Sequence, residues 1–275
     1  MHRFSALFFG LITALMAPAA MAEVIGMAKP KQLSFQEPAS PVMEQFINLH
    51  DYILVIITVI TLFVVALLAY TCVRFSAKRN PTPSKTSHNT LIEIIWTAVP
   101  VVILVAIAIP SLRVHYNYVY DYPEPDVTLK VVGYQWYWNY EYPDEGIIFD
   151  SNMKTDDMLE EGEPRLLAVD NPIVVPVNKN VRVQVTGGDV LHAFAIPAFG
   201  VKKDTVPGRL NETWFKATKE GTFYGQCSEL CGIRHGFMPI QVEVVSEEEY
   251  AAWLEEAKEK FAKDDFGTSR YASAE

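Results

Sequence analysis

Two long stretches without a charged side chain constrain the fold of this chain more than any other feature. They cover residues 52–73 and 94–112. As α-helices they would span roughly 33 and 28 Å, close to the thickness of the hydrocarbon core of a bilayer. We therefore predict two membrane-spanning helices, joined as a hairpin over residues 46–113. Pro100 lies inside the second stretch and predicts a kink there, because proline removes a helical hydrogen bond.

The segment between the two stretches is basic and predicts the orientation of the hairpin. Its basic residues are Arg74, Lys78, Arg79 and Lys85, and there is no acidic residue between Arg74 and Glu93. By the positive-inside rule this loop is cytoplasmic. Residues 1–22, with a basic start, an apolar run and the ending APAAMA, are typical of a signal peptide. Residues 23–45 then form an exported lead-in. We expect a bacterial inner-membrane protein with two spans, and with both termini and residues 114–275 in the periplasm.

Short runs of apolar or alternating residues fill positions 127–245 and predict an all-β domain over residues 114–245. The runs are VTLKVVG, QWYWNYEY, RLLAVD, NPIVVPV, VRVQVTG, LHAFAI, TWFKA, TFYGQ and IQVEVV, with Gly, Pro, Asn and Asp between them. This spacing favours a sandwich or barrel. We predict a C-terminal helix over 246–263 and a poorly ordered tail over 264–275.

A cluster of soft metal ligands lies between the last two predicted strands. The segment CSELCGIRHGFM contains Cys227, Cys231, His235 and Met238, and His192 lies on an earlier predicted strand. Thiolate and thioether ligands favour copper over oxygen-preferring cations. A late loop with Cys, His and Met, after a His on an earlier strand, is typical of blue-copper proteins. We therefore predict a Greek-key cupredoxin barrel that holds copper.

Other interpretations of this loop exist. A disulfide between Cys227 and Cys231 would suit an oxidising compartment, but it leaves His192, His235 and Met238 unexplained. Two cysteines and two histidines are also a zinc set, although the methionine and the absence of a Cys-x2-Cys knuckle argue against zinc. One thiolate can complete one copper site, whereas two bridging thiolates would make a dinuclear cluster.

The loop resembles that of subunit II of the haem–copper cytochrome c oxidases, and the likeness extends from about residue 40 to 255. The resemblance implies a dinuclear centre, CuA, in which Cys227 and Cys231 bridge two copper ions. It implies that His192 and His235 bind one ion each, and that Met238 and the carbonyl of Glu229 are weak axial ligands. The side chain of Glu229 would bind a magnesium ion at the boundary with subunit I.

The same resemblance implies a function. The chain would be the electron-entry subunit of a respiratory oxidase, accepting electrons from cytochrome c and passing them to haem in subunit I, where O2 is reduced to water with proton translocation. Its partners would be subunit I, other oxidase subunits, cytochrome c and membrane lipid. The chain has no Cys-x2-Cys-His haem motif, so oxygen chemistry must reside in another subunit.

Two further residues have both a structural and a functional interpretation. In GYQWYWNYEY, over 133–142, we expect Trp138 and Tyr140 in the core, whereas the resemblance places Trp136 on the surface as the entry point for electrons. Glu93 with Thr90 matches a capping box that begins the second span. The resemblance also makes Glu93 a proton-entry carboxylate on the cytoplasmic side.

The exported part is strongly acidic. From residue 114 onward, 28 Asp and Glu stand against 15 Lys and Arg, a net charge of −13, while the whole chain carries −10. This charge excludes nucleic acid as a partner and would attract a basic protein. For the helix over 246–263 we prefer solubility as the explanation. The resemblance assigns cytochrome c docking to the acids predicted near the metal loop, namely Asp189, Asp170, Glu141 and Asp144.

Two other classes of protein share parts of this pattern. A copper chaperone of thioredoxin-like fold also uses Cys-x3-Cys and a distant histidine, but two spans and the nearby His and Met argue against it. Subunit II of a quinol oxidase shares the hairpin and the barrel as a copper-free structural subunit, but it would lack the ligands that are complete here. Copper content separates the three classes. The cytochrome c oxidase subunit would hold two ions tightly, the chaperone one readily released ion, and the quinol-oxidase subunit none.

Overall fold

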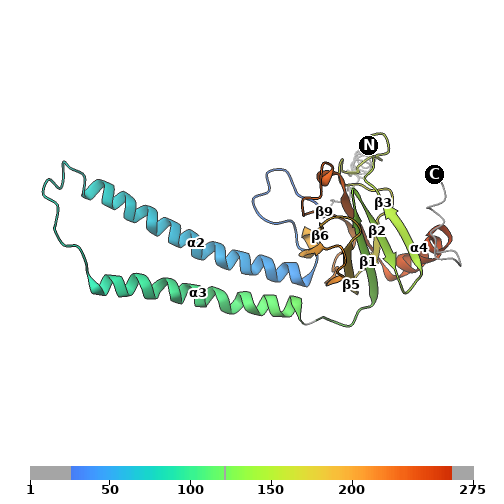
Figure 1. The fold of residues 1–275 in the computed structure, drawn as a ribbon, viewed down its shortest axis with the longest axis horizontal. Helices are drawn as coiled ribbons and strands as arrows, with labels where there is room; N and C mark the ends of the chain where they lie inside the picture. The colour runs from blue at the N-terminus through green and yellow to red at the C-terminus, as the bar shows by residue number, and fades with distance from the viewer. Residues whose placement is uncertain (1–25, 121, 262–275) are drawn as a thin grey trace, which may run out of the picture.

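The chain consists of a long helical hairpin attached to a β domain (Figure 1). The computed structural model describes residues 26–120 and 122–261. The predicted signal peptide, 1–22, and the predicted tail, 264–275, lie outside the described residues.

The first helix, α2, covers Pro41–Arg74 and begins well before the predicted span. Its N-cap is Ser40, whose Oγ accepts a hydrogen bond from the Met43 amide at 3.0 Å. Serine at the N-cap followed by proline in the first turn is a strong helix start, because proline fixes φ at a helical value where no amide donor is required. The end of the predicted lead-in is therefore helical.

The second helix, α3, covers Thr90–Val119 and is also longer than predicted. Its N-cap is Asn89, so the expected capping box lies one residue earlier than the sequence pattern indicated. Asn89 Oδ1 accepts a hydrogen bond from the Ile92 amide at 3.2 Å, and the Glu93 carboxylate accepts one from the Asn89 amide at 3.1 Å. Pro100 lies within the helix, as does Pro110.

Both helices are apolar on all sides and almost unburied by the rest of the chain. Their most apolar windows have mean hydropathies of 3.0 and 2.6, and none of those residues is buried. A helix that is apolar all round requires lipid or other apolar helices as its surroundings. The prediction of two transmembrane helices is confirmed.

The β domain has two five-stranded sheets packed face to face. One sheet has the order β3-β2-β1-β5-β8 and the other β4-β10-β9-β6-β7. The pairs β1/β5 and β4/β10 are parallel, and the other pairs are antiparallel. The strands are β1 Val127–Tyr134, β2 Tyr137–Tyr142, β3 Ile147–Ser151, β4 Ile173–Pro176, β5 Asn180–Gly187, β6 His192–Ile196, β7 Val201–Thr205, β8 Asn211–Lys216, β9 Gly221–Cys227 and β10 Pro239–Val245. The predicted cupredoxin fold class is confirmed.

The core lies between the two sheets and is built by alternation along the strands. Every second side chain of β1 and β5 is buried, as expected for strands with one face on the core. Trp138 and Tyr140 on β2 are fully buried, which confirms the prediction that they are core residues. They meet side chains such as Phe194 of the opposite sheet, whose ring centroid lies 5.7 Å from that of Trp138.

One strand prediction was wrong, and two strands were not predicted. The run RLLAVD does not form a strand; residues 165–167 are a turn, and Val169 makes only an isolated bridge to Met153. Strands β3 and β7 were missed. Both are edge strands, and the sequence of β7, VKKDT, carries the charges that edge strands use to prevent unwanted pairing. Such a strand lacks the apolar alternation on which the prediction depended.

The C-terminal helix α4, Glu247–Phe261, covers one end of the β domain. Its apolar side chains pack onto β2 and β3: the ring of Trp253 lies 5.2 Å from that of Tyr142, and Phe261 lies 4.8 Å from Phe149. The acidic helix predicted over 246–263 therefore closes the core as well as presenting charge.

Candidate metal centre

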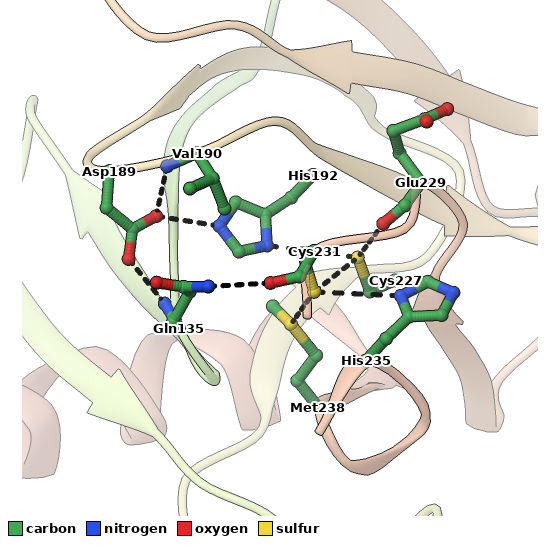
Figure 2. A network of polar contacts seen from close by, with 9 residues as sticks. All are labelled: Gln135, Asp189, Val190, His192, Cys227, Glu229, Cys231, His235 and Met238. Carbon is green, nitrogen blue, oxygen red and sulfur yellow. Dashed lines mark hydrogen bonds and ion pairs between the residues drawn. The ribbon is translucent and has the colours of Figure 1, made fainter. Parts of the chain in front are cut away.

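The loop between β9 and β10 carries most of the predicted ligands. Cys227 is the last residue of β9, and Met238 directly precedes β10. His235 begins the short 3-10 helix η2, His235–Phe237. His192 begins β6, and the pairing of Phe194 with Cys227 places β6 beside β9. Four residues of one loop and a histidine from the neighbouring strand thus converge on one place (Figure 2).

The sulfur and nitrogen atoms of this cluster face one another at short range. The two cysteine Sγ atoms are 3.8 Å apart, and both thiols are free. A disulfide bond would need about 2.05 Å, so the disulfide alternative is not realised in this structure. Each sulfur faces one imidazole: Cys227 Sγ lies 3.9 Å from His192 Nδ1, and Cys231 Sγ lies 3.6 Å from His235 Nδ1.

Two weaker donors complete the cluster. Met238 Sδ lies 3.5 Å from Cys231 Sγ, and the carbonyl oxygen of Glu229 lies 3.3 Å from Cys227 Sγ. The Glu229 carboxylate is exposed and points away from the sulfur atoms, while its carbonyl points toward them. The backbone and the side chain of Glu229 are thus available to different ligands.

The cluster is shielded from water on most sides. His192, Met238 and both cysteines are buried, and His235 is half-buried. Burial opposes ionisation of Cys227, but its hydrogen bonds, first with His192 and then with Ala193, Glu229 and His235, together outweigh burial and lower the pKa of this thiol. Burial and the neighbouring Cys227 raise the pKa of Cys231. Cys227 is therefore the first of the two to become a thiolate, the form that binds metal.

The donor set fits copper. A sulfur separation of 3.8 Å is less than twice the ~2.3 Å length of a metal–thiolate bond, so one ion can contact both sulfurs. His192, Cys227 and Cys231 together have ligand atoms within 4.8 Å of one another. Two thiolates, two imidazole nitrogens, a thioether and a carbonyl form a soft set that suits copper and excludes magnesium and calcium.

Asp189 fixes the ring of His192. Its Oδ1 lies 2.9 Å from His192 Nε2, and because a carboxylate can only accept, Nε2 carries the proton and Nδ1 faces Cys227. Burial lowers the pKa of His192, but the hydrogen bonds with Cys227 and Asp189 outweigh it and raise that pKa. Asp189 also accepts hydrogen bonds from the amides of Gln135 and Val190, at 2.7 and 2.6 Å. An acid–histidine–metal arrangement of this kind raises ligand basicity, a role that sequence reasoning missed.

The aromatic segment around β2 packs directly on the metal loop. Gln135 donates from Nε2 to the carbonyl of Cys231 at 2.7 Å. The indole of Trp136 lies over Gly232, where an added Cβ would stand 3.1 Å from Cζ2. Trp136 is half-buried, and its Nε1 has no hydrogen-bond partner within the described part of the chain. Trp138 donates from Nε1 to the carbonyl of Met238 at 3.1 Å. Neither Gln135 nor Trp138 was predicted to support the site. The one signal in the sequence was that both lie within two residues of Trp136.

The predicted docking acids do not form one patch. Tyr142 pairs with Ile147 and Trp138 with Ser151, so the β2–β3 turn with exposed Asp144 lies at the end of the hairpin away from Trp136. Glu141 lies next to that end and is bound to Lys130 at 2.9 Å.

Asp170, in contrast, lies at the Trp138 end. It accepts a hydrogen bond from the Asn152 amide at 2.7 Å, and Asn152 follows Ser151 in the chain. Only Asp189 and Asp170 of the four acids therefore lie on the side of the metal loop. Glu93 is remote from this site, since α3 separates it from the β domain by roughly 40 Å.

Comparison with known proteins places this geometry in a family. Residues 127–245 match the family described as cytochrome c oxidase subunit II, periplasmic domain, and residues 28–114 match its transmembrane domain. A probable cytochrome c oxidase subunit 2 of Rickettsia prowazekii is 56% identical over 224 residues, covering 81% of this chain and 71% of the relative. Cytochrome c oxidase subunit 2 of Cereibacter sphaeroides is 52% identical over 254 residues, covering 86% and 84%.

Among solved structures, the periplasmic domain of subunit II of cytochrome oxidase (CoxB) of Bradyrhizobium japonicum is similar. It is 63% identical and covers 51% of this chain and 99% of that chain, with a TM-score of 0.49.

The fold and the site together define a membrane-anchored cupredoxin with a candidate metal site of cysteine and histidine. The chain belongs to the cytochrome c oxidase subunit II family. It is accordingly an inner-membrane subunit of a haem–copper oxidase.

Proposed function

We propose that this chain is the electron-entry subunit of its oxidase, accepting electrons from cytochrome c at a dinuclear copper centre and delivering them to haem in subunit I. One observation carries the proposal: two free sulfur atoms lie 3.8 Å apart, and each faces the Nδ1 atom of its own histidine. This paired arrangement offers equivalent positions to two ions, which a mononuclear site does not need.

Two copper ions held by these ligands would together take up and release one electron at a time. The residues of the chain fix the ligands for this purpose. Asp189 holds the ring of His192, Trp138 holds the carbonyl of Met238, and Gln135 holds the carbonyl of Cys231. Ligands that are bonded to a second layer of residues move little when charge changes, and little movement favours fast electron transfer.

Trp136 is proposed as the place where electrons enter. Its half-buried indole lies against Gly232, the residue that follows Cys231. No other tryptophan of the described chain combines partial exposure with contact to the metal loop: Trp138 is fully buried, and Trp96, Trp214 and Trp253 lie on α3, β8 and α4.

The remaining assignments complete the proposal. We assign to the exposed carboxylate of Glu229 a magnesium ion whose other ligands come from subunit I, and to Glu93 proton entry at the opposite membrane surface. The basic loop between α2 and α3 supports a cytoplasmic position for Glu93, and hence a periplasmic position for the copper domain and both termini. We propose docking of cytochrome c near Trp136, with Asp189 and Asp170 the best placed of the predicted acids.

Electron paramagnetic resonance of the assembled, oxidised complex tests the copper assignment. We expect a hyperfine pattern from one unpaired electron shared by two equivalent copper nuclei, and two more copper ions per complex than the haem site requires. Cys231→Ser should convert the signal toward that of a single nucleus. Cys72→Ser, which changes an exposed cysteine on α2, is the matched control and should leave it unchanged. A single-nucleus pattern in the unaltered complex, or one readily released ion, would contradict the proposal.

A further inference from the structure

A cavity with a largely apolar lining and a few polar groups lies where the helical hairpin meets the β domain. Its volume is about 350 Å³, and its walls come from the start of α2, the end of α3 and the outer face of β8. The polar and aromatic residues that line it are Gln45, Asn117, Tyr118, Asn180, Trp214 and Lys216. β8 is an edge strand of one sheet, whereas β9 and β10 belong to the other sheet. The cavity and the loop between β9 and β10 are therefore carried by different sheets.

The walls of this cavity are held together by hydrogen bonds between α3 and β8. Tyr118 Oη lies 2.6 Å from Thr213 Oγ1, and Trp214 donates from Nε1 to the carbonyl of Tyr118 at 3.2 Å. On the α2 side, the ring of Phe46 packs edge-on against Tyr118 at 5.6 Å. The open cavity is therefore lined by three elements that these contacts join to one another.

The cavity has a positive charge without a matching negative one. Lys216 is half-buried, and within residues 26–120 and 122–261 no carboxylate forms an ion pair with it. The acid on the same strand, Glu212, is already paired with Arg182 at 2.9 Å. A half-buried ammonium group loses part of its hydration, so an anionic ligand at this position would be favoured.

The neighbouring side chains add donors rather than negative charge. The amide groups of Gln45, Asn117 and Asn180 each carry two N–H donors. Asn180 uses one of them to bind the carbonyl of Glu124 at 3.2 Å. A cavity lined by one lysine and three amide side chains can offer several donors to a phosphate group, whose oxygens accept several hydrogen bonds.

The position of the cavity along the helices indicates where such a phosphate would come from. Uncharged residues begin after Asp51 on α2 and end before Arg113 on α3. Gln45 lies about 9 Å beyond the first limit and Asn117 about 6 Å beyond the second, at 1.5 Å per residue. Headgroups occupy roughly the first 5–8 Å outside the hydrocarbon core. Tyr118 and Trp214 at this level match the aromatic belt of membrane proteins.

We propose that this cavity binds the phosphate of a membrane phospholipid, with Lys216 as its charged contact and the amides of Gln45 and Asn117 as further donors. The acyl chains would lie along the apolar surfaces of α2 and α3. The bound lipid would join the hairpin to the β domain at the membrane surface. The proposal is independent of the copper centre and of electron transfer.

Photolabelling of the assembled oxidase tests this site. The complex would be placed in phosphatidylcholine vesicles containing a small fraction of phosphatidylglycerol with a photoreactive headgroup, irradiated and digested. We expect label on the peptides that contain Asn117 and Lys216. Lys216→Met should reduce that label about tenfold, the loss expected for one hydrogen bond to a charged group. Gln45→Leu should reduce it less.

Lys202→Met is the matched control. Lys202 is an exposed lysine on the edge strand of the other sheet, and its loss should leave the label unchanged. Copper content and haem spectra should stay normal in Lys216→Met, which shows that the complex has assembled. Excess inorganic phosphate should not displace the lipid. Absence of label in the unaltered complex, equal label in Lys216→Met, or displacement by free phosphate would overturn the proposal.

Discussion

His192 and Asp189 form a bonded pair in which the carboxylate oxygen lies 2.9 Å from Nε2, so that Nδ1 is directed at Cys227. The histidine is completely buried, whereas about a third of the Asp189 side chain is exposed. The aspartate therefore connects the interior of the site with the surface on which Trp136 lies. It can influence metal binding from inside and partner binding from outside, and these two effects can be separated by mutation.

Replacement of Asp189 by asparagine should weaken copper binding. The neutral amide can still accept one hydrogen bond, but it stabilises the His192 ring less, and loss of such a supporting residue typically reduces metal affinity by about 10- to 100-fold. Copper retained per complex after dialysis against increasing chelator measures the effect. Asp144→Asn removes the same charge at the far end of the β2–β3 hairpin and should retain copper normally. Equal retention in the two variants would show that Asp189 does not support the metal site.

A side chain at position 232 should displace Trp136. Gly232 has φ +123°, and an added Cβ would stand 3.1 Å from both Trp136 Cζ2 and Gln135 Nε2. Gly232→Ala should therefore cost about 1–3 kcal/mol in stability through backbone strain and slow electron uptake from cytochrome c. Gly236→Ala is the control within the same loop, because nothing lies within 4 Å of its added Cβ. Stopped-flow reduction, with the copper spectrum as a check on the site, distinguishes the two variants.

Oxidation of cytochrome c should slow as ionic strength rises, because the net negative charge of residues 114–275 should favour association with a basic protein at low salt. The acids should not contribute equally. Asp170→Asn should reduce both the association rate and its dependence on salt, since Asp170 lies at the Trp138 end of the β2–β3 pair. Asp144→Asn should change neither. If the two variants behaved alike, docking would not be centred on the metal loop.

Glutamine at position 93 should separate two roles of Glu93. The Glu93 side chain accepts a hydrogen bond from the Asn89 amide, and glutamine can replace it in a capping box but cannot carry a proton. Glu93→Gln should therefore preserve assembly and the helix start while lowering oxygen consumption, whereas Glu93→Ala should affect both. Normal turnover in Glu93→Gln, with a defect confined to Glu93→Ala, would leave Glu93 with only its capping role.

Stability at acidic pH should depend on Glu212. Hydrogen bonds from Gln184 and then Arg182 lower the pKa of this carboxyl below its ordinary value. A lowered pKa in the folded state contributes stability above the ordinary carboxyl pKa, and that contribution is lost as pH falls through the folded value. Because the ion pair is partly exposed, Glu212→Gln should cost only about 0.5–1 kcal/mol at neutral pH.

Thermal unfolding of the purified complex between neutral and acidic pH measures this difference. The gap in melting temperature between the unaltered complex and Glu212→Gln should shrink as the medium becomes more acidic. Glu161→Gln, at an exposed position, serves as the control. A gap that stayed constant with pH would mean that the charge of Glu212 does not contribute.

The convergence of the candidate ligands was predictable because these residues are close in sequence and chemically unusual. Cys227, Cys231, His235 and Met238 share one loop, and His192 precedes them on a strand that pairs directly with β9. The sequence also indicated both membrane helices, since a buried helix of a soluble domain seldom has an uncharged stretch of that length.

The supporting contacts were not predictable from the same patterns. Asp189 and Gln135 bind the site through single hydrogen bonds, most of them between segments that are far apart in the chain, and no spacing rule identifies such pairs. Surface charge gave a similar difficulty. Asp144 and Asp189 look equivalent as acidic residues in the sequence. The register of β2 against β3 places Asp144 at the far end of the hairpin, whereas the hydrogen bond from the Gln135 amide places Asp189 beside the metal loop.

The β domain is attached to the hairpin at two separate points. Ser40 Oγ donates to the carbonyl of Phe199 at 2.7 Å just before α2, and Tyr118 is bonded to Thr213 near the end of α3. A single attachment would let the domain rotate about its linker, whereas two attachments, one at the 3-10 helix Pro197–Phe199 and one at β8, restrict that rotation. The candidate metal centre is thus held at a constant height and angle relative to the hairpin, and under the proposed function an electron leaving it would cross the same distance on every turnover.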